Sequence, residues 1–187
     1  MSSIESKPAV LTVHPSTPND AVRSLGVRVR AEKSDILVFH YMLAADMSRV
    51  RVPPSGVGRP ADALWKHTCF EAFVAAAGAP GYHEFNFSPS RDWAIYRFSA
   101  YREGMSRAEM GAAPQISVRR CDGGLELESE VRLRCLADLR DARHLRVAMA
   151  AVLEDETGGL SYWGLRHAPG KPDFHHPNGF ALEVARS

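Results

Sequence analysis

Two nearby segments carry most of the side chains whose types and spacing could do chemistry. They are Leu64–Phe73 (LWKHTCFEAF) and Tyr82–Pro89 (YHEFNFSP). Both alternate large aromatic rings with His, Glu and Asn at the two-residue period of a β-strand, so polar groups and flat apolar faces can share one sheet surface. A binding concavity for a polar, ring-shaped ligand needs this combination. The segments therefore indicate a binding site more clearly than a particular reaction.

A third cluster of polar and aromatic residues lies near the C-terminus. It begins at Tyr162–His167 (YWGLRH) and continues into a proline-rich loop that carries Lys171, Asp173, His175 and His176. A loop stiffened by proline loses less entropy when it closes on a ligand, so this cluster is expected to complete the same site. Arg166 and Lys171 indicate a ligand with a phosphate or carboxylate group, because a guanidinium binds either group through two parallel hydrogen bonds.

Two of the candidate residues also have an ordinary structural interpretation. Trp65 could be a core residue, since an indole buries a large area wherever it packs. Glu71 lies in an otherwise apolar strand, where a carboxylate must be paired or hydrogen-bonded. Arg91, Arg97 or Lys66 could form a structural ion pair with it. The sequence leaves both roles open for Trp65 and for Glu71.

The two faces of the second segment differ in chemistry. Glu84 and Asn86 share one face of the predicted strand, whereas His83, Phe85 and Phe87 take the other. The aromatic face is expected to join the core. Glu84 and Asn86 are then expected to point toward a groove or toward solvent.

The three cysteines, Cys69, Cys121 and Cys135, include no close pair and no zinc-type spacing. Each is expected to be a small buried hydrophobe in a reducing compartment. The alternative is a nucleophilic Cys69 activated by His67 or His83, because a reactive thiol needs a partner that lowers its pKa.

Composition limits the class of protein. The chain has 187 residues, 45% of them hydrophobic, which is enough to fill the core of one domain. We expect a flexible, polar N-terminus over residues 1–8 and a single domain over residues 9–187. With 23 basic and 22 acidic side chains, nothing predicts binding to nucleic acid or to an anionic membrane. The polar N-terminus lacks the apolar core of an export signal, and no apolar run reaches the roughly 18 residues of a membrane helix, so a cytoplasmic location is expected.

Alternation of apolar and polar residues predicts strands through most of the chain. Residues 25–30 and 35–43 alternate in this way and are joined by a short polar link, which predicts an antiparallel hairpin. A second hairpin is expected around Asp122–Gly124, whose glycines can adopt the positive φ of a tight turn. Across it, Arg119 and Arg120 are expected to pair with two glutamates, Glu126 and Glu128.

About nine or ten strands with turn signals between them predict an all-β fold, an antiparallel β-sandwich of the jelly-roll or immunoglobulin-like kind. Helical signals are confined to single turns at Pro60–Leu64 and Leu136–Leu139. Three long connections, Asp46–Ala63, Arg102–Pro114 and Arg166–Asn178, are expected to supply ligand contacts, because binding residues concentrate on loops of a rigid scaffold.

The order of these residues resembles a known family. The pattern Leu64-Trp65-x-x-x-Cys69-x-Glu71-x-Phe73, followed by Tyr82-x-Glu84-Phe85-x-x-Ser88-Pro89, resembles the DOMON-like superfamily, in the branch similar to family 9 carbohydrate-binding modules. The resemblance extends from about Leu25 to Val184 and is greatest to small bacterial members that stand alone. It implies a β-sandwich that binds a sugar or haem.

In the sugar-binding members, two tryptophans hold a pyranose ring between them and polar side chains bond its hydroxyls. The resemblance places Trp65 as the first indole and Trp163 as the second. The full set of ligand-binding residues expected here is Trp65, His67, Glu71, Glu84, Asn86, Arg91, Trp163, Arg166, His167 and Lys171. The ligand is then a saccharide or an anionic sugar derivative.

The haem-binding members use a methionine and a histidine as axial ligands. None of the methionines and histidines of this chain matches those positions, so haem is disfavoured and no cofactor is expected. A dense Asp/Asn loop of the kind that binds calcium is also missing, and adjacent histidines such as His175 and His176 point apart, so no metal is predicted.

Two other functions compete with a saccharide-binding module. The first is an enzyme, a hydrolase or isomerase, in which Glu71 or Glu84 acts as general base and His83 or His167 as acid. The second is an interaction domain that binds a protein partner through an open sheet face.

Overall fold

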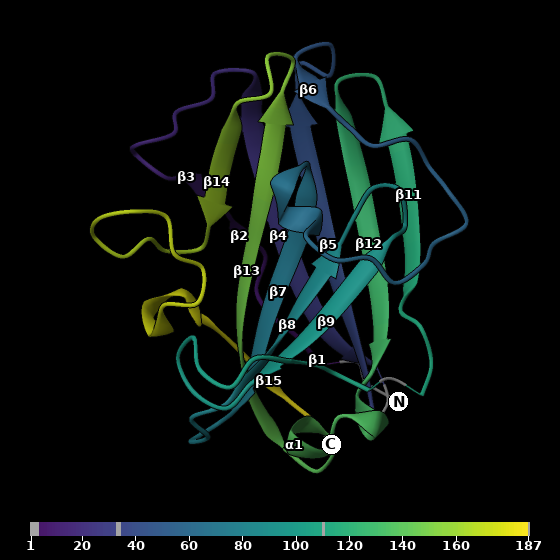
Figure 1. Ribbon diagram of the computed structural model, residues 1–187, viewed down its shortest axis with the longest axis vertical. Helices are drawn as coiled ribbons and strands as arrows, with labels where there is room; N and C mark the ends of the chain where they lie inside the picture. Colours follow the sequence, from purple (N-terminus) through teal and green to yellow (C-terminus); the bar gives the residue numbers. More distant parts are fainter. Residues whose placement is uncertain (1–3, 33–34, 110, 187) are drawn as a thin grey trace.

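Two antiparallel sheets packed face to face form the scaffold of the protein (Figure 1), in a computed structural model that describes residues 4–32, 35–109 and 111–186. Within these residues the first sheet has six strands, in the order β1-β4-β5-β12-β11 with β2 paired to β4. They are β1 (Ile4–Glu5), β2 (Ala9–Val10), β4 (Val22–Glu32), β5 (Ile36–Ala45), β11 (Gln115–Cys121) and β12 (Gly124–Arg132). The predicted antiparallel β-sandwich is confirmed.

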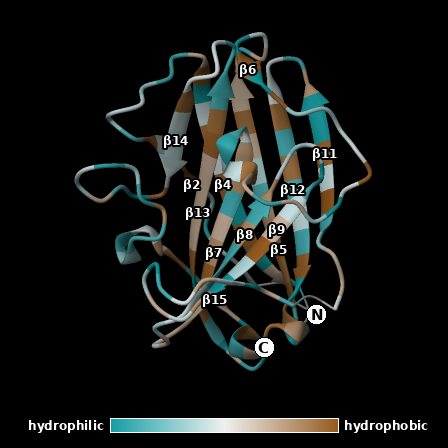
Figure 2. Cartoon of the chain, in the orientation of Figure 1, coloured by the Kyte–Doolittle hydropathy of each residue, from teal (hydrophilic) through white to brown (hydrophobic). Residues whose placement is uncertain are grey.

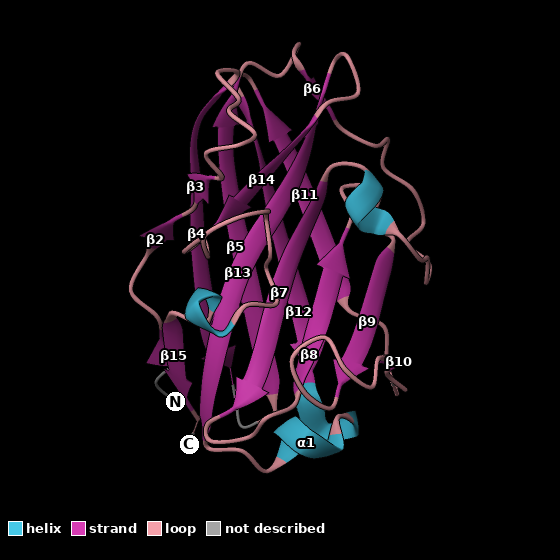
Figure 3. Cartoon of the chain, turned by 60° about the vertical axis from the view of Figure 1, so that its left-hand side comes forward, coloured by secondary structure: helices cyan, strands magenta, loops and turns pink. Residues whose placement is uncertain are grey.

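The second sheet has nine strands in the described chain, in the order β10-β9-β8-β7-β13-β14-β3, with β6 and β15 also paired to β13. They are β3 (Thr12–Val13), β6 (Val50–Arg51), β7 (Cys69–Ala76), β8 (Tyr82–Phe87), β9 (Trp93–Phe98), β10 (Ser106–Arg107), β13 (His144–Asp155), β14 (Leu160–Gly164) and β15 (Leu182–Ala185). Figure 3 shows β13, β7, β8 and β9 side by side in front of the first sheet.

The core between the sheets follows the two-residue period of the strands. The inward positions of β4 and β5 are fully buried apolar residues, and the two strands pair as the predicted hairpin. From this side, the ring of Phe39 lies 5.8 Å from the ring of Phe85 and 5.8 Å from that of Phe87 on the opposing sheet. The alternation is visible as brown and teal bands along the strands in Figure 2. Phe85 and Phe87 are thus in the core, as predicted.

The second predicted hairpin joins β11 to β12, and Gly123 adopts a φ of 82° in its turn. One of the expected cross-strand ion pairs forms, between Arg119 and Glu126 at 2.6 Å. Arg120 donates to the backbone oxygen of Pro53 instead, and Glu128 pairs with an arginine of β4. The expected Arg120–Glu128 pairing is wrong because Arg120 lies opposite Leu125 and Glu128 lies opposite Ser117, so strand alternation puts the two side chains on different faces of the sheet.

Unlike a sheet with one solvated face, the second sheet is also buried on its outer side. A second apolar cluster covers that face: Phe73, Ala75, Tyr82, Ala94, Tyr96, Phe98, Ala148 and Ala150. Leu64, Phe174 and Phe180 pack onto this cluster from the connecting loops. One of these loops is the roof loop, residues 165–181, which links β14 to β15 and includes η3 (Pro177–Gly179). In Figure 3 this turn lies in front of β13.

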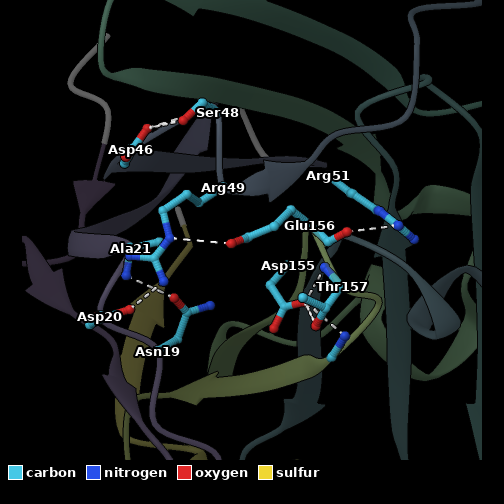
Figure 4. Close-up of polar contacts among 11 residues, drawn as sticks. Asn19, Asp20, Ala21, Asp46, Ser48, Arg49, Arg51, Asp155, Glu156 and Thr157 are labelled. Carbon is cyan, nitrogen blue, oxygen red and sulfur yellow. Dashed lines mark hydrogen bonds and ion pairs between the residues drawn. The ribbon is translucent and has the colours of Figure 1, made fainter.

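A polar network joins the start of β6 to the end of β13 and to the turn that leads into β14 (Figure 4). Arg49 donates to Asp20 at 2.8 Å and to Glu156 at 3.4 Å, while Arg51 donates to the backbone oxygen of Glu156 at 2.8 Å. The carboxylate of Asp155 accepts the backbone N–H groups of the turn that follows it. These bonds hold the β13–β14 turn against the start of β6.

The first described strand, β1, pairs with Arg30 and Ala31 of β4. One local prediction of helical structure needs correction. The first helical turn is η1 (Leu64–Lys66) rather than 60–64, because Ala63 adopts a left-handed φ of 58° and breaks the backbone there. Two further helical turns, η2 (Leu133–Cys135) and α1 (Ala137–Arg140), lie where the second helical turn was predicted, at Leu136–Leu139.

No helix in the described ranges is long and apolar enough to cross a membrane.

The cysteines are unbridged, but only Cys69 is a buried hydrophobe of the kind expected. Cys121 and Cys135 are exposed, at the β11–β12 turn and in η2, where the strand pattern no longer turns side chains inward. Burial raises the pKa of the Cys69 thiol well above its usual range, and the charge of Glu71 raises it further. This thiol is therefore not activated as a nucleophile.

Candidate functional site

A cavity of about 520 Å³ opens on the outer face of the second sheet. We call it the outer-face cavity. Aromatic side chains form much of its wall, and four polar side chains reach into it. The lining residues are Trp65, Glu71, Glu84, Tyr96, Phe98, Arg102, Met105, Val152, Tyr162, Pro172, Phe174 and His175. Loops far apart in the sequence thus meet over the middle strands of one sheet.

The floor of the cavity carries two acidic residues from neighbouring strands. Glu71 of β7 lies opposite Asn86 of β8, and Glu84 of β8 lies opposite Phe73 of β7. Because side chains alternate along a strand, both carboxyl groups leave the sheet on its outer face. Ala150 is the neighbour of Glu71 on β13, and its small side chain leaves space above the floor.

The carboxyl of Glu84 is held from beneath. Asn86 is fully buried and donates to Glu84 Oε1 at 2.7 Å, and Cys69 Sγ lies 3.7 Å from the amide oxygen of Asn86. Burial raises the pKa of Glu84, whereas the hydrogen bond from Asn86 and the charge of Arg102 oppose that rise. Asn86 therefore orients a cavity residue and does not itself line the cavity.

The carboxyl of Glu71 has no comparable support. It is buried, and its Oε1 has no hydrogen-bond partner within the described residues. The structural ion pair with Arg91, Arg97 or Lys66 does not form, and Arg97 instead pairs with Asp138 at 2.5 Å. Burial raises the pKa of Glu71 well above its usual range, and the nearby charge of Glu84 raises it further. Of the two groups, Glu71 therefore holds a proton more strongly than Glu84.

His175 of the roof loop closes the cavity above Glu84. Its Nδ1 hydrogen-bonds to the Tyr82 hydroxyl at 2.8 Å, and its Nε2 lies 3.7 Å from Glu84 Oε2. The imidazole packs edge-on against Phe73 at 5.1 Å and Phe98 at 5.0 Å. Burial lowers the pKa of His175 to about 4, and the charge of Arg102 contributes to this shift, so the ring is neutral at neutral pH.

Asp173 ties the roof loop to the loop after β9. It accepts from Arg102 Nη2 at 2.7 Å and from the hydroxyl of Tyr101. It also accepts the backbone N–H of His175 at 3.0 Å. The guanidinium of Arg102 lines the cavity, but its charge is matched by this carboxylate. The same contacts position His175.

Aromatic rings stand on two sides of the cavity mouth. On one side, Trp65 of η1 is 39% exposed and lies edge-on to Tyr96 at 6.0 Å. The Tyr96 hydroxyl donates to Asp62 at 2.6 Å, which holds this ring in place. On the other side, Tyr162 of β14 lies 6.0 Å from Phe174. A flat apolar ring could contact both walls while its polar edge faced the carboxyl groups.

Comparison with known proteins places this geometry on a recognised scaffold. No family model and no curated protein matches the chain. A Bacteroides uniformis protein provisionally described as carbohydrate-binding is similar, with a TM-score of 0.66 and 18% identity over 97% of this chain and 86% of that one. The chain has the fold of a carbohydrate-binding module. At this identity the likeness shows the fold alone.

Two structures of family 9 carbohydrate-binding modules from Caldicellulosiruptor kristjanssonii show the same fold. The complex with glucose has a TM-score of 0.56 and 10% identity, over 96% of this chain and 83% of that one. The complex with cellotriose has a TM-score of 0.51 and 8% identity, over 96% and 82% respectively. The carbohydrate-binding-module-like scaffold is thus shared over nearly the whole chain.

The expected pair of indoles across one cavity does not form on this carbohydrate-binding-module-like scaffold. Trp163 is only 6% exposed, packs in the core between the sheets, and donates from Nε1 to Ser161 Oγ at 3.0 Å. Strand alternation turns Trp163 inward and its neighbour Tyr162 outward. Tyr162 therefore occupies the wall position that was expected for Trp163.

The remaining predicted residues lie away from the outer-face cavity. His67 contacts Glu154 at 2.7 Å and lines a neighbouring groove. His167 bonds the backbone oxygen of Thr12 through Nε2 at 2.7 Å. Arg91, Arg166 and Lys171 are exposed and do not line the cavity. The cations that indicated an anionic ligand are thus not at its wall.

Tyr162 and His175 belong to the C-terminal cluster that was expected to complete the site, although neither was among the predicted ligand contacts. Sequence reasoning missed the other seven lining residues: Tyr96, Phe98, Arg102, Met105, Val152, Pro172 and Phe174. Alternation along β9 and β14 could have identified the residues on those strands. Within the described ranges, no group of three or more His, Cys, Asp and Glu side chains is arranged to hold a metal ion.

Proposed function

We propose that this protein is a small-molecule binding module that holds a saccharide in the outer-face cavity. The observation that carries the proposal is that the aromatic residues Trp65 and Tyr162 line the same cavity as the acidic residues Glu71 and Glu84. The cavity volume of about 520 Å³ suits a small sugar. Pyranose rings present apolar C–H faces to aromatic walls and hydroxyl groups to carboxyl oxygens.

The shared scaffold supports this choice of ligand. Family 9 modules with the same fold were determined in complex with glucose and with cellotriose. Membership in the DOMON-like superfamily and a cytoplasmic location are part of the same proposal. The predicted ligand contacts of Trp65, Glu71 and Glu84 are retained in it, with Asn86 acting through Glu84.

Calorimetric titration against glucose, cellobiose and xylose tests the proposal. We expect saturable binding, and a loss of roughly tenfold or more in affinity on Trp65→Ala, because that change removes a stacking face. Trp65→Phe is the matched control, since it keeps a ring and should retain part of the affinity. Absence of binding to every saccharide, or unchanged affinity in Trp65→Ala, contradicts the proposal.

The acidic pair favours a second candidate, an enzyme that acts on a saccharide. A buried Glu71 with a raised pKa beside a hydrogen-bonded Glu84 is an arrangement suited to acid and base roles. His83 lies on the core side of the sheet and His167 lies outside the cavity, so neither is placed for the acid role given to it. Release of product from nitrophenyl glycosides, abolished in Glu71→Gln while sugar binding persists, would identify an enzyme.

A further inference from the structure

The charge balance of the outer-face cavity is acidic. Its charged lining residues are Glu71, Glu84 and Arg102. Arg102 forms its ion pair with Asp173 at 2.7 Å, and within the described chain no ion pair joins it to either glutamate. The cations of Arg166 and Lys171 do not line the cavity. Two carboxyl groups therefore face the cavity without a cation bonded to them.

Both carboxyl groups also keep an acceptor atom free for a ligand. Glu71 Oε1 is buried and has no hydrogen-bond partner among the described residues. Glu84 uses Oε1 to accept from Asn86, but its Oε2 is 3.7 Å from His175 Nε2, which is longer than a hydrogen bond. A buried acceptor left without a donor is unfavourable, so a ligand that supplies donors at this point gains affinity.

We propose that Glu71 and Glu84 bind a primary ammonium group, so that the preferred ligand is an amino sugar with a free amine; this inference rests on the proposed saccharide-binding function. An ammonium group has three donors and no acceptor, which matches a pair of carboxyl acceptors. Hydrogen bonds between charged partners are roughly twice as strong as neutral ones.

The aromatic wall supports the same ligand. Trp65, Tyr96 and Phe98 line the cavity together with the two glutamates. Aromatic ring faces attract cations, and most strongly where water is excluded. A carboxylate or phosphate on the sugar would instead meet two acidic groups in a partly desolvated site. The structure thus reverses the anionic preference that Arg166 and Lys171 indicated in the sequence.

Titration of the wild-type protein with glucose, glucosamine, N-acetylglucosamine and glucuronic acid tests the inference at about pH 7, where most primary amines carry a proton. We expect glucosamine to bind roughly tenfold more tightly than glucose, since a charged hydrogen bond replaces a neutral one. N-acetylglucosamine should lose this advantage because acetylation removes the charge. Glucuronic acid should bind most weakly.

Two variants assign the preference to the carboxyl groups. Glu71→Gln and Glu84→Gln should each reduce the ratio of glucosamine affinity to glucose affinity to about twofold or less, with both affinities measured on the same variant. Glu183→Gln, an exposed change on β15 away from the cavity, should leave the preference unchanged. Circular dichroism establishes that each variant is folded.

The outcomes separate the two proposals. If glucose binds and glucosamine binds no more tightly, or if glucuronic acid binds most tightly, the inference is wrong and the saccharide-binding function stands. If none of the sugars binds, the proposed function and the inference fail together. The wild-type selectivity decides between these results even if a glutamine variant does not fold.

Discussion

The two acidic residues of the floor differ because their neighbours differ. Glu84 accepts a hydrogen bond from Asn86, whereas Glu71 Oε1 accepts none from the described residues. A buried carboxylate without a donor is costly, so the pKa of Glu71 is raised more than that of Glu84. The two carboxyl groups of the floor therefore differ in how readily they release a proton.

Glu71 is expected to make the protein less stable as pH rises. Its pKa in the folded protein lies well above the ordinary value of 4.5, so the folded state holds a proton that the unfolded state releases. Its stabilising contribution is complete below 4.5 and is lost as pH rises toward the folded pKa. Glu71→Gln should therefore raise the free energy of unfolding at neutral pH by roughly 1–3 kcal/mol.

Urea denaturation at about pH 5 and about pH 7.5 measures this effect, and the gain should be larger at the higher pH, because the stability that the wild-type carboxyl loses grows as pH rises from 4.5 toward its folded pKa. Glu183→Gln serves as the control for removing a negative charge from the surface. A glutamine variant that is less stable than wild type at the higher pH would contradict the account of Glu71.

His175 has the opposite pH dependence. Burial lowers its pKa from 6.5 to about 4, so the unfolded state takes up a proton that the folded state refuses. The contribution of His175 is present above 6.5 and is lost as pH falls from 6.5 through 4. His175→Gln should remove this part of the loss of stability at acid pH, although it also removes the contacts of the imidazole with the neighbouring rings. Thermal melts between about pH 7 and pH 4 check it, and an unchanged slope would count against the assignment.

At the scale of single elements, β14 decides which aromatic residue reaches the ligand. Ser161 and Trp163 point into the core, and Tyr162 lines the outer-face cavity. Tyr162→Ala should weaken saccharide binding roughly tenfold, because it removes one stacking wall. Trp163→Phe should leave binding unchanged and cost about 1 kcal/mol of stability through loss of the Nε1 hydrogen bond to Ser161.

Calorimetry and urea denaturation of the two variants distinguish these roles. If a folded Trp163→Phe protein binds saccharide more weakly while Tyr162→Ala binds it fully, then Trp163 and not Tyr162 forms the wall of the cavity.

The sequence predicted what strand periodicity controls. Alternation identified the hairpin of β4 and β5, and it placed Phe85 in the core and Glu84 on the opposite face. The inference about Trp163 failed because it came from a loose family alignment rather than from the alternation of its own strand. The two-residue period of a strand determines which face of the sheet a side chain occupies. An alignment error of one residue reverses that face, and a remote resemblance is not accurate to one residue.

Loops explain most of what the sequence did not predict. Arg102 and His175 come from two of the long connections that were expected to hold ligand contacts, yet the spacing of loop residues does not determine where their side chains point. Their positions depend on Asp173, which bonds both segments. Such a contact, between residues about seventy positions apart, has no local signature in the sequence.

At the scale of the whole molecule, the protein consists of a sandwich with its own core and a separate roofed face. The inner core joins both sheets, whereas the outer cluster is covered by η1 and by connecting loops, including the roof loop. Regions held by few apolar contacts open more easily than core strands. The roof is therefore expected to open without unfolding the sandwich.

Asp173→Asn tests this separation, because asparagine keeps the size of the side chain but removes the charge that pairs with Arg102. Hydrogen exchange should become faster in residues 100–106 and 165–181 and remain unchanged in β4 and β5, and glucose should bind more weakly because His175 is no longer held over Glu84. A saturating ligand, by binding only the closed roof, should restore part of the protection. If exchange in β4 and β5 rises equally, the roof and the sandwich open as one cooperative unit, and the carboxylate of Asp173 stabilises the whole fold rather than the site.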